Sequence, residues 1–254
     1  MYCPGCGRET PAEYSGPICP SCGATLPHPE GARSGPAGIP WEDRGRLGFF
    51  QALLSTLRLC LADPTRFFSD LPKRENLGSA IQYLLLLTWV GGIGGIVWSQ
   101  VFQTSQMALL RSLGINVPEQ GWPAGVRGLF TVGFAVLIPI AVLISTFIWT
   151  GIVHVFLWMI GGAKEGFEAT LRVYAYSRGS TALFEWVPFC GGLVAFVWSL
   201  ILQIIGLARV HEIGGGKAAL AVLLPLALCC VVMLALFAAF FGAIMALLGQ
   251  SAGT

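Results

Sequence analysis

Residues 81–102 read IQYLLLLTWVGGIGGIVWSQVF, an apolar run without Asp, Glu, Lys or Arg. A helix of roughly 20 apolar residues crosses a bilayer core of about 30 Å, so this run predicts a transmembrane helix. The glycine pairs Gly91-Gly92 and Gly94-Gly95 would let a second helix approach closely, because glycine has no side chain to keep the backbones apart. The run therefore indicates a membrane protein with tight helix packing at this point.

The composition of the chain also indicates a membrane protein. Of its 254 residues 55% are hydrophobic and only 11% are charged, whereas soluble domains have about 45–50% apolar and about 25% charged residues. The basic residues concentrate before Leu77, at positions Arg8, Arg33, Arg44, Arg46, Arg58, Arg66, Lys73 and Arg74. We therefore expect a polar N-terminal part followed by a membrane part.

Four further apolar segments follow residues 81–102. They cover residues 129–160, 167–187, 193–207 and 218–248. Residues 167–187 are the least apolar, since they include Glu168, Arg172, Arg178 and Glu185, and this segment suits a span only if its neighbours shield the charges. The predicted fold is an all-α polytopic membrane helix bundle with about five transmembrane helices over residues 77–254.

Basic loop residues predict the orientation of this bundle, because cytoplasmic loops are enriched in Lys and Arg. Arg66, Lys73 and Arg74 precede the first span, and Lys164, Arg172, Arg209 and Lys217 lie in or near the loops assigned to the same side, whereas residues 189–192 and 249–254 carry no charge. The loop that holds Arg111 and Arg127 is the one exception to this pattern. The sequence also begins without the basic and apolar run of a secretory signal peptide. Five spans then place the N-terminus in the cytoplasm and the C-terminus outside. If residues 167–187 do not cross, the C-terminus lies inside.

Residues 41–76 predict amphipathic helices at the membrane boundary. Apolar residues recur at helical spacing at Leu47, Phe50, Leu54, Leu57 and Leu61. One interpretation is a helix in the cytoplasmic headgroup layer, anchored by Trp41. The other is a helix packed on the membrane domain. Asp63-Pro64 is typical of a helix start, with an N-cap followed by proline at the first helical position.

Two Cys-x-x-Cys pairs mark a metal site at the N-terminus. Cys3-Pro4-Gly5-Cys6 and Cys19-Pro20-Ser21-Cys22 are each followed by glycine, which permits the tight turn that brings two thiolates onto one ion. Four cysteines complete a tetrahedral shell, so residues 1–26 predict a structural zinc ribbon; an iron site or a redox dithiol is the alternative. Residues 27–40 have the Pro, Gly, Ala and Ser composition of a flexible linker, in which we expect a solvated His28.

The remaining cysteines lack metal spacing. Cys60, Cys190, Cys229 and Cys230 lie in apolar stretches, and we expect them to pack as small hydrophobic side chains.

Polar residues inside the membrane part are candidates for function, because ionisable groups are costly there. Arg178 and Glu185 are two helical turns apart and share a face with Tyr174. They could pair with each other or with His154, and could line a polar cavity or a proton path. The alternative is a structural polar seam, and for Gln203 an interhelical hydrogen bond is expected.

Several function classes lack support in the sequence. The ribbon has no basic stripe for nucleic acid, since Arg8 is balanced by Glu9 and Glu13. The chain has no Gly-x-Ser-x-Gly elbow, no His-Glu-x-x-His pair and no phosphate-binding glycine loop. We therefore predict a protein that is not an enzyme.

From Asp63 onward the chain resembles the Yip family, the Ypt/Rab-interacting membrane proteins. The resemblance rests on scattered residues, namely Pro64, Phe67-Phe68, His154, Gly161-Gly162, Phe167, Thr170, Leu171, Tyr174, Ala175, Pro188, Gly191-Gly192, Trp198, Gly206-Leu207, His211 and Lys217-Ala218. It implies a five-span bundle with a cytoplasmic N-terminus, of a kind that in eukaryotes contacts small GTPases in vesicle traffic. The zinc ribbon is an addition to this family pattern.

Two functions fit these features. In the first, the chain is an integral membrane scaffold or adaptor in the lipid bilayer, and its ribbon binds a cytoplasmic protein. In the second, it is a small transporter or channel with a polar path near His154, Arg178 and Glu185. Pro139 and Pro225 would supply the helix breaks that transporters use.

Overall fold

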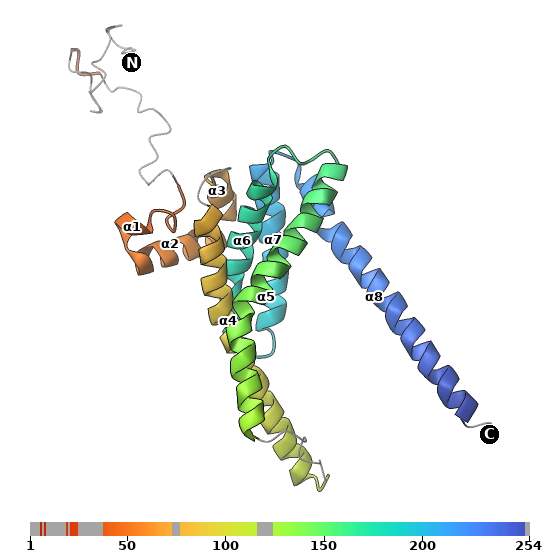
Figure 1. The fold of residues 1–254 in the computed structure, drawn as a ribbon. Coiled ribbons are helices and arrows are strands. Elements are labelled where there is room, and N and C mark those ends of the chain that lie inside the picture. The colour runs from red at the N-terminus through yellow and green to blue at the C-terminus, as the bar shows by residue number, and fades with distance from the viewer. Residues whose placement is uncertain are drawn as a thin grey trace. The chain divides into compact units, whose positions relative to one another are not determined.

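The computed structural model describes residues 6, 8, 19, 21–24, 38–72, 77–115 and 124–251. The chain forms two compact units, residues 1–37 and 38–254. All regular secondary structure among the described residues is helical, which confirms the predicted all-α class (Figure 1). In chain order the helices are α1 (Arg44–Leu47), α2 (Phe49–Ala62), α3 (Pro64–Ser69), α4 (Leu77–Ser112), α5 (Ala124–Met159), α6 (Phe167–Ala182), η1 (Leu183–Trp186), α7 (Gly191–Val210) and α8 (Gly215–Ser251).

Three short helices precede the bundle. Gly48 separates α1 from α2 with a φ of 85°, a conformation that favours glycine. Asp63 caps α3 as predicted, since its carboxylate accepts a hydrogen bond from the backbone N–H of Arg66 at 3.2 Å and Pro64 begins the helix. α2 contacts α6 and α3, so this helix packs on the membrane domain along one side.

The other side of α2 is apolar and exposed. Phe49, Phe50 and Leu54 are 47%, 74% and 63% exposed, whereas Ala52 and Cys60 are buried. The buried side of α2 fits the helix packed on the membrane domain, and the headgroup-layer interpretation stays a prediction for the exposed side. Trp41 is different, because it is only 3% exposed and packs inside the protein, so its side chain is not a headgroup anchor.

The long helices run in alternating directions through the bundle (Figure 1). α4 runs parallel to α6 and η1, since the Tyr83 hydroxyl contacts the Ser180 hydroxyl of α6 at 2.8 Å, and further along both segments Trp98 of α4 donates to the carbonyl of Trp186 in η1 at 2.8 Å. α7 runs against α6, because Gly206 lies beside Val173 and Gly191 beside Phe184. The helices lie where the sequence predicts the five apolar segments, and α5 and α8 continue through Pro139 and Pro225.

Four described helices have the length and apolar composition of a membrane span: Leu77–Ser112, Gly128–Met159, Gly191–Val210 and Gly215–Gly242. α6 has only 16 residues, and η1 extends it toward α7. α6 contacts α2, α4, α5 and α7, and most of its residues are buried. The neighbouring helices therefore bury Arg172 completely, whereas Arg178 and Glu185 remain 31% and 21% exposed, so the charges of residues 167–187 are shielded only in part.

The glycines of residues 81–102 have the predicted role in helix packing. A Cβ at Gly91 would lie 2.3 Å from the carbonyl oxygen of Ala182, and one at Gly94 would lie 2.8 Å from the Trp186 ring. Real side chains do not approach so closely. α4 can therefore contact α6 and η1 at this distance only with glycine at these two positions.

The prediction for the four scattered cysteines is wrong for three of them. Cys60 is fully buried, as expected, but Cys190, Cys229 and Cys230 are exposed. Cys229 and Cys230 lie on the part of α8 whose side chains contact little of the bundle, so an apolar environment there must come from outside the chain. Burial raises the pKa of the Cys60 thiol to about 12, and a hydrogen bond with Ser180 partly opposes this rise.

Candidate functional site

Three cysteines of the N-terminal unit come together in space. The sulfur atoms of Cys6, Cys19 and Cys22 all lie within 4.8 Å of one another, and those of Cys6 and Cys19 are 3.9 Å apart. Zinc–sulfur bonds of about 2.3 Å in a tetrahedron separate two thiolates by about 3.8 Å. The spacing of these thiols therefore fits zinc. The fourth predicted ligand, Cys3, lies outside the described residues.

The turn after Cys19 has the geometry that the sequence predicts. The Cys19 N–H donates to the Ala24 carbonyl at 2.8 Å, and the Gly23 N–H donates to the Cys19 carbonyl at 2.9 Å. Gly23 has a φ of 70°, which favours glycine over other residues. This turn brings Cys19 and Cys22 to the same side, as a shared metal ion requires.

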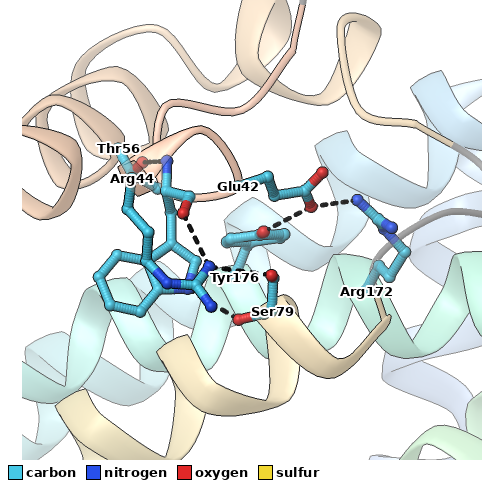
Figure 2. A network of polar contacts seen from close by, with 7 residues as sticks. Glu42, Arg44, Thr56, Ser79, Arg172 and Tyr176 are labelled. Carbon is cyan, nitrogen blue, oxygen red and sulfur yellow. Dashed lines mark hydrogen bonds and ion pairs between the residues drawn. The ribbon is translucent and has the colours of Figure 1, made fainter. Parts of the chain in front are cut away.

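A buried ion pair joins the segment before α1 to the middle of the bundle. Arg172 of α6 donates through Nη2 to Glu42 Oε1, and the Tyr176 hydroxyl donates to the same oxygen at 2.8 Å (Figure 2). The side chains of Arg172 and Glu42 are 0% and 8% exposed. Among the described residues, Nε and Nη1 of Arg172 have no hydrogen-bond partner. Glu42 is therefore the main stabilising charge for a fully buried guanidinium.

The residues next to Glu42 fix the same segment to two more helices. The Trp41 backbone N–H donates to Thr56 Oγ1 of α2 at 2.8 Å, and its indole N–H donates to the Ser79 carbonyl of α4 at 2.8 Å. Arg44 donates to Ser79 Oγ at 3.0 Å (Figure 2) and to Gln82 Oε1 at 2.7 Å. We call residues 41–44 the anchor segment, because they connect α2, α4 and α6.

A chain of hydrogen bonds joins the ends of α5, α6 and α7. The Glu165 N–H donates to His211 Nδ1 at 3.1 Å, so a neutral His211 carries its proton on Nε2 and donates to Thr170 Oγ1 at 3.0 Å. The Thr170 hydroxyl then donates to His154 Nδ1 at 2.8 Å. Three residues that carry the Yip resemblance thus form one connected group, the histidine chain, which holds the loop after α5 against the end of α7.

The second ion pair lies further along α6. Arg178 Nη2 and Glu185 Oε1 are 2.5 Å apart, so the two predicted partners do pair with each other. They line a cavity of about 220 Å³, which we call the α6 cavity. Its wall also includes Trp149, Tyr174, Gly192, Ala195, Phe196, Ser199, Leu200, Gln203 and Leu226. Tyr174 lies on the predicted face, and Gln203 accepts the expected interhelical hydrogen bond, from the Trp149 indole at 3.0 Å.

The structure separates His154 from the other two intramembrane candidates. His154 belongs to the histidine chain, whereas Arg178 and Glu185 face the α6 cavity. Glu42 is not among the residues that the sequence marks as candidates, and His211 is marked only by the Yip resemblance. Arg172 and Tyr176 are four residues apart, so the sequence could have predicted that they share one face of a helix. Nothing in the sequence links them to Glu42, which is 130 residues away.

Comparison with known families agrees with this architecture. The model of the Yip1 domain matches residues 59–249, which is more than half of the chain. The match begins in α2 and ends in α8, so it includes Arg172, the histidine chain and the α6 cavity, whereas the cysteine cluster and Glu42 precede it. The comparison with curated proteins gave no match, and neither did the comparison with solved structures.

Proposed function

The chain belongs to the Yip1 domain family of integral membrane proteins, and from this premise we propose that it is a non-enzymatic membrane scaffold whose zinc ribbon binds a cytoplasmic protein. The anchor segment carries this proposal. It is the first part of the 38–254 unit, and its contacts with α2, α4 and α6 tie the chain that follows the ribbon to the interior of the membrane domain. A partner held by the ribbon would thereby be kept at the bilayer.

The ribbon has the residues for a purely structural metal site. Cys3, Cys6, Cys19 and Cys22 would hold zinc in a closed shell of four thiolates, which leaves no position for a substrate. Bound zinc supplies folding free energy to a module too small to form a core of its own. The spacing of the three described sulfurs supports this assignment.

The proposed orientation places the ribbon in the cytoplasm and the C-terminus outside. Lys164, Arg209 and Lys217 support it, because all three lie in or next to the loops that join α5 to α6 and α7 to α8. Basic loops are retained on the cytoplasmic side. The alternating directions of α4 to α8 put the start of α4 at this same end of the bundle (Figure 1).

Crosslinking in intact membranes, followed by mass spectrometry, tests the scaffold. We expect the wild-type chain to capture a cytoplasmic protein that the Cys3→Ser, Cys6→Ser variant does not. The Cys229→Ser, Cys230→Ser variant is the matched control, since it also removes two thiols but outside the ribbon, and it should capture the same protein. Capture of membrane neighbours alone by all three chains would contradict the scaffold.

The α6 cavity favours a second candidate function, a small transporter or channel. It places a polar space beside an ion pair among helices that are otherwise apolar. The path would use Arg178 and Glu185, and His154 would take part only from its separate position at the end of α5. Solute flux into vesicles containing the purified chain tests it, and equal flux through wild type and an Arg178→Met, Glu185→Met variant would contradict it.

A further inference from the structure

The α6 cavity is partly open to the surface of the bundle and is much larger than one water molecule. Its 220 Å³ greatly exceed the roughly 10–15 Å³ that hold one water molecule. Here the wall is partly polar, with Tyr174, Ser199 and Gln203 beside the ion pair. The cavity therefore has the features of a binding site.

The ion pair leaves much of its bonding capacity unused. The described residues give it one side-chain hydrogen bond, from Arg178 Nη2 to Glu185 Oε1. The two side chains remain 31% and 21% exposed. The other guanidinium N–H groups and the second carboxylate oxygen are thus available for a ligand. In a membrane these groups need a polar partner, because hydrocarbon cannot solvate them.

The cavity extends from the middle of the bilayer core toward the side opposite the basic loops. Arg178 follows the first residue of α6, Phe167, by 11 residues, whereas Glu185 follows it by 18 residues. At 1.5 Å per residue these separations are about 17 Å and about 27 Å. The basic loop before α6 marks the headgroup layer of one side, so Arg178 lies about halfway through a core of about 30 Å and Glu185 lies near its far side.

The cavity adjoins the place where α8 leaves the bundle. Leu226 of α8 forms part of its wall. The C-terminal part of α8 diverges from α5 and α7 (Figure 1). Leu228, Val231 and Leu234 of α8 are 55%, 62% and 68% exposed. This part of α8 is therefore an apolar surface that suits lipid tails.

We propose that the α6 cavity binds the headgroup of a zwitterionic phospholipid whose tails lie between α8 and the rest of the bundle. The phosphate contacts Arg178, whose guanidinium can donate two parallel hydrogen bonds to it. The ammonium group contacts Glu185 and the faces of Trp149 and Tyr174, which attract cations. With an anionic headgroup, Glu185 and the phosphate would share the single cation Arg178, whereas a zwitterionic headgroup supplies a second cation. Binding of this lipid does not depend on the scaffold function, and it requires no net transport.

Lipid binding to the purified full chain tests the proposal by native mass spectrometry. The probes are dioleoyl-phosphatidylethanolamine, dioleoyl-phosphatidylglycerol and soluble phosphoethanolamine. Arg178→Met, Glu185→Met removes the charges together, which keeps the fold because an apolar pair can replace a buried ion pair. Gly192→Leu fills the cavity and keeps the charges, since a Cβ there meets no atom within 4 Å. Gly133→Leu, equally unhindered but on α5 and outside the cavity wall, is the control.

We expect the wild type and Gly133→Leu to bind phosphatidylethanolamine at least tenfold more tightly than phosphatidylglycerol. Both cavity variants should lose at least tenfold of this affinity, and phosphoethanolamine should not displace the lipid. Unchanged binding in both cavity variants, or equal binding of the two lipids, overturns the proposal. Displacement by phosphoethanolamine also overturns it, because the site would then belong to a soluble zwitterion. Absence of solute flux with lipid binding intact would count against the transporter alone.

Discussion

Two ion pairs on one helix differ in what surrounds them. Arg172 and Arg178 both belong to α6, but Arg172 is fully buried against Glu42 whereas Arg178 remains 31% exposed beside Glu185. The first pair has Tyr176 as a third member. The second pair, Arg178 and Glu185, lines the α6 cavity of about 220 Å³. Six residues of separation direct the two side chains to different faces of the helix.

The difference shows that charge inside a membrane bundle has two separate uses. A pair enclosed by protein fixes one arrangement of the chain, since removal of either partner leaves a buried charge alone. A pair at the edge of a cavity keeps donors and acceptors free for another molecule. Stability measurements on matched variants can separate these two uses.

The largest effect is expected for Glu42→Gln. This change keeps the shape of the side chain but removes the charge that compensates Arg172, so we expect a loss of about 3–5 kcal/mol in the free energy of unfolding. Reversible denaturation in mixed micelles measures it. Asp43→Asn is the control, because its carboxylate pairs with Arg46 at 2.6 Å in an exposed position and should contribute less than about 1 kcal/mol. Equal losses for the two variants would show that Glu42 is not structural.

A smaller effect is expected for Tyr176→Phe. The variant loses the 2.8 Å hydrogen bond to Glu42 but keeps the ring, which contacts Phe67 and Tyr83 at centroid distances of 5.3 and 5.2 Å. A hydrogen bond to a charged group is worth about 1.5–3 kcal/mol, and we expect a loss in that range. In the Glu42→Gln background the same change should cost much less. If the two losses simply add, Tyr176 does not act through Glu42.

The smallest effect is expected for Arg178→Met. The α6 cavity leaves Glu185 accessible to polar partners after the change, so we expect a loss of about 1 kcal/mol, close to the range for exposed pairs. The same denaturation assay measures it. A loss as large as that of Glu42→Gln would mean that Glu185 becomes an isolated buried charge, which would contradict an accessible cavity.

Much of the fold could be predicted from the sequence, because membrane helices need long apolar runs and leave a local signal. Residues 81–102, 129–160 and 193–207 all lie within or almost within one helix each. The glycines of α4 and the Asp63 cap were also predictable, since each depends on a few neighbouring residues. Helix ends were less certain, and α4 continues ten residues beyond Phe102, to Ser112.

In the candidate sites, contacts within one segment were predictable, and contacts between distant segments were not. Arg178 and Glu185 could be paired because both belong to one short stretch of chain. Glu42 and Arg172 could not, because their contact depends on how the segment before α1 folds back onto α6. His154 was a candidate partner for Arg178, but its neighbours are Thr170 and, through it, His211. Contacts between distant segments depend on tertiary packing, which spacing alone does not define.

The anchor segment also has a mechanical consequence. Tension applied to the chain at Gly38 reaches the buried Ile39 and then Trp41 and Glu42, which transmit it to α2, α4 and α6 through buried contacts. The elements that carry the load are then among the most buried in the protein. Under pulling, the first bonds to rupture would be those of Glu42 and Trp41, and α6 would lose the counter-ion of Arg172 at that moment.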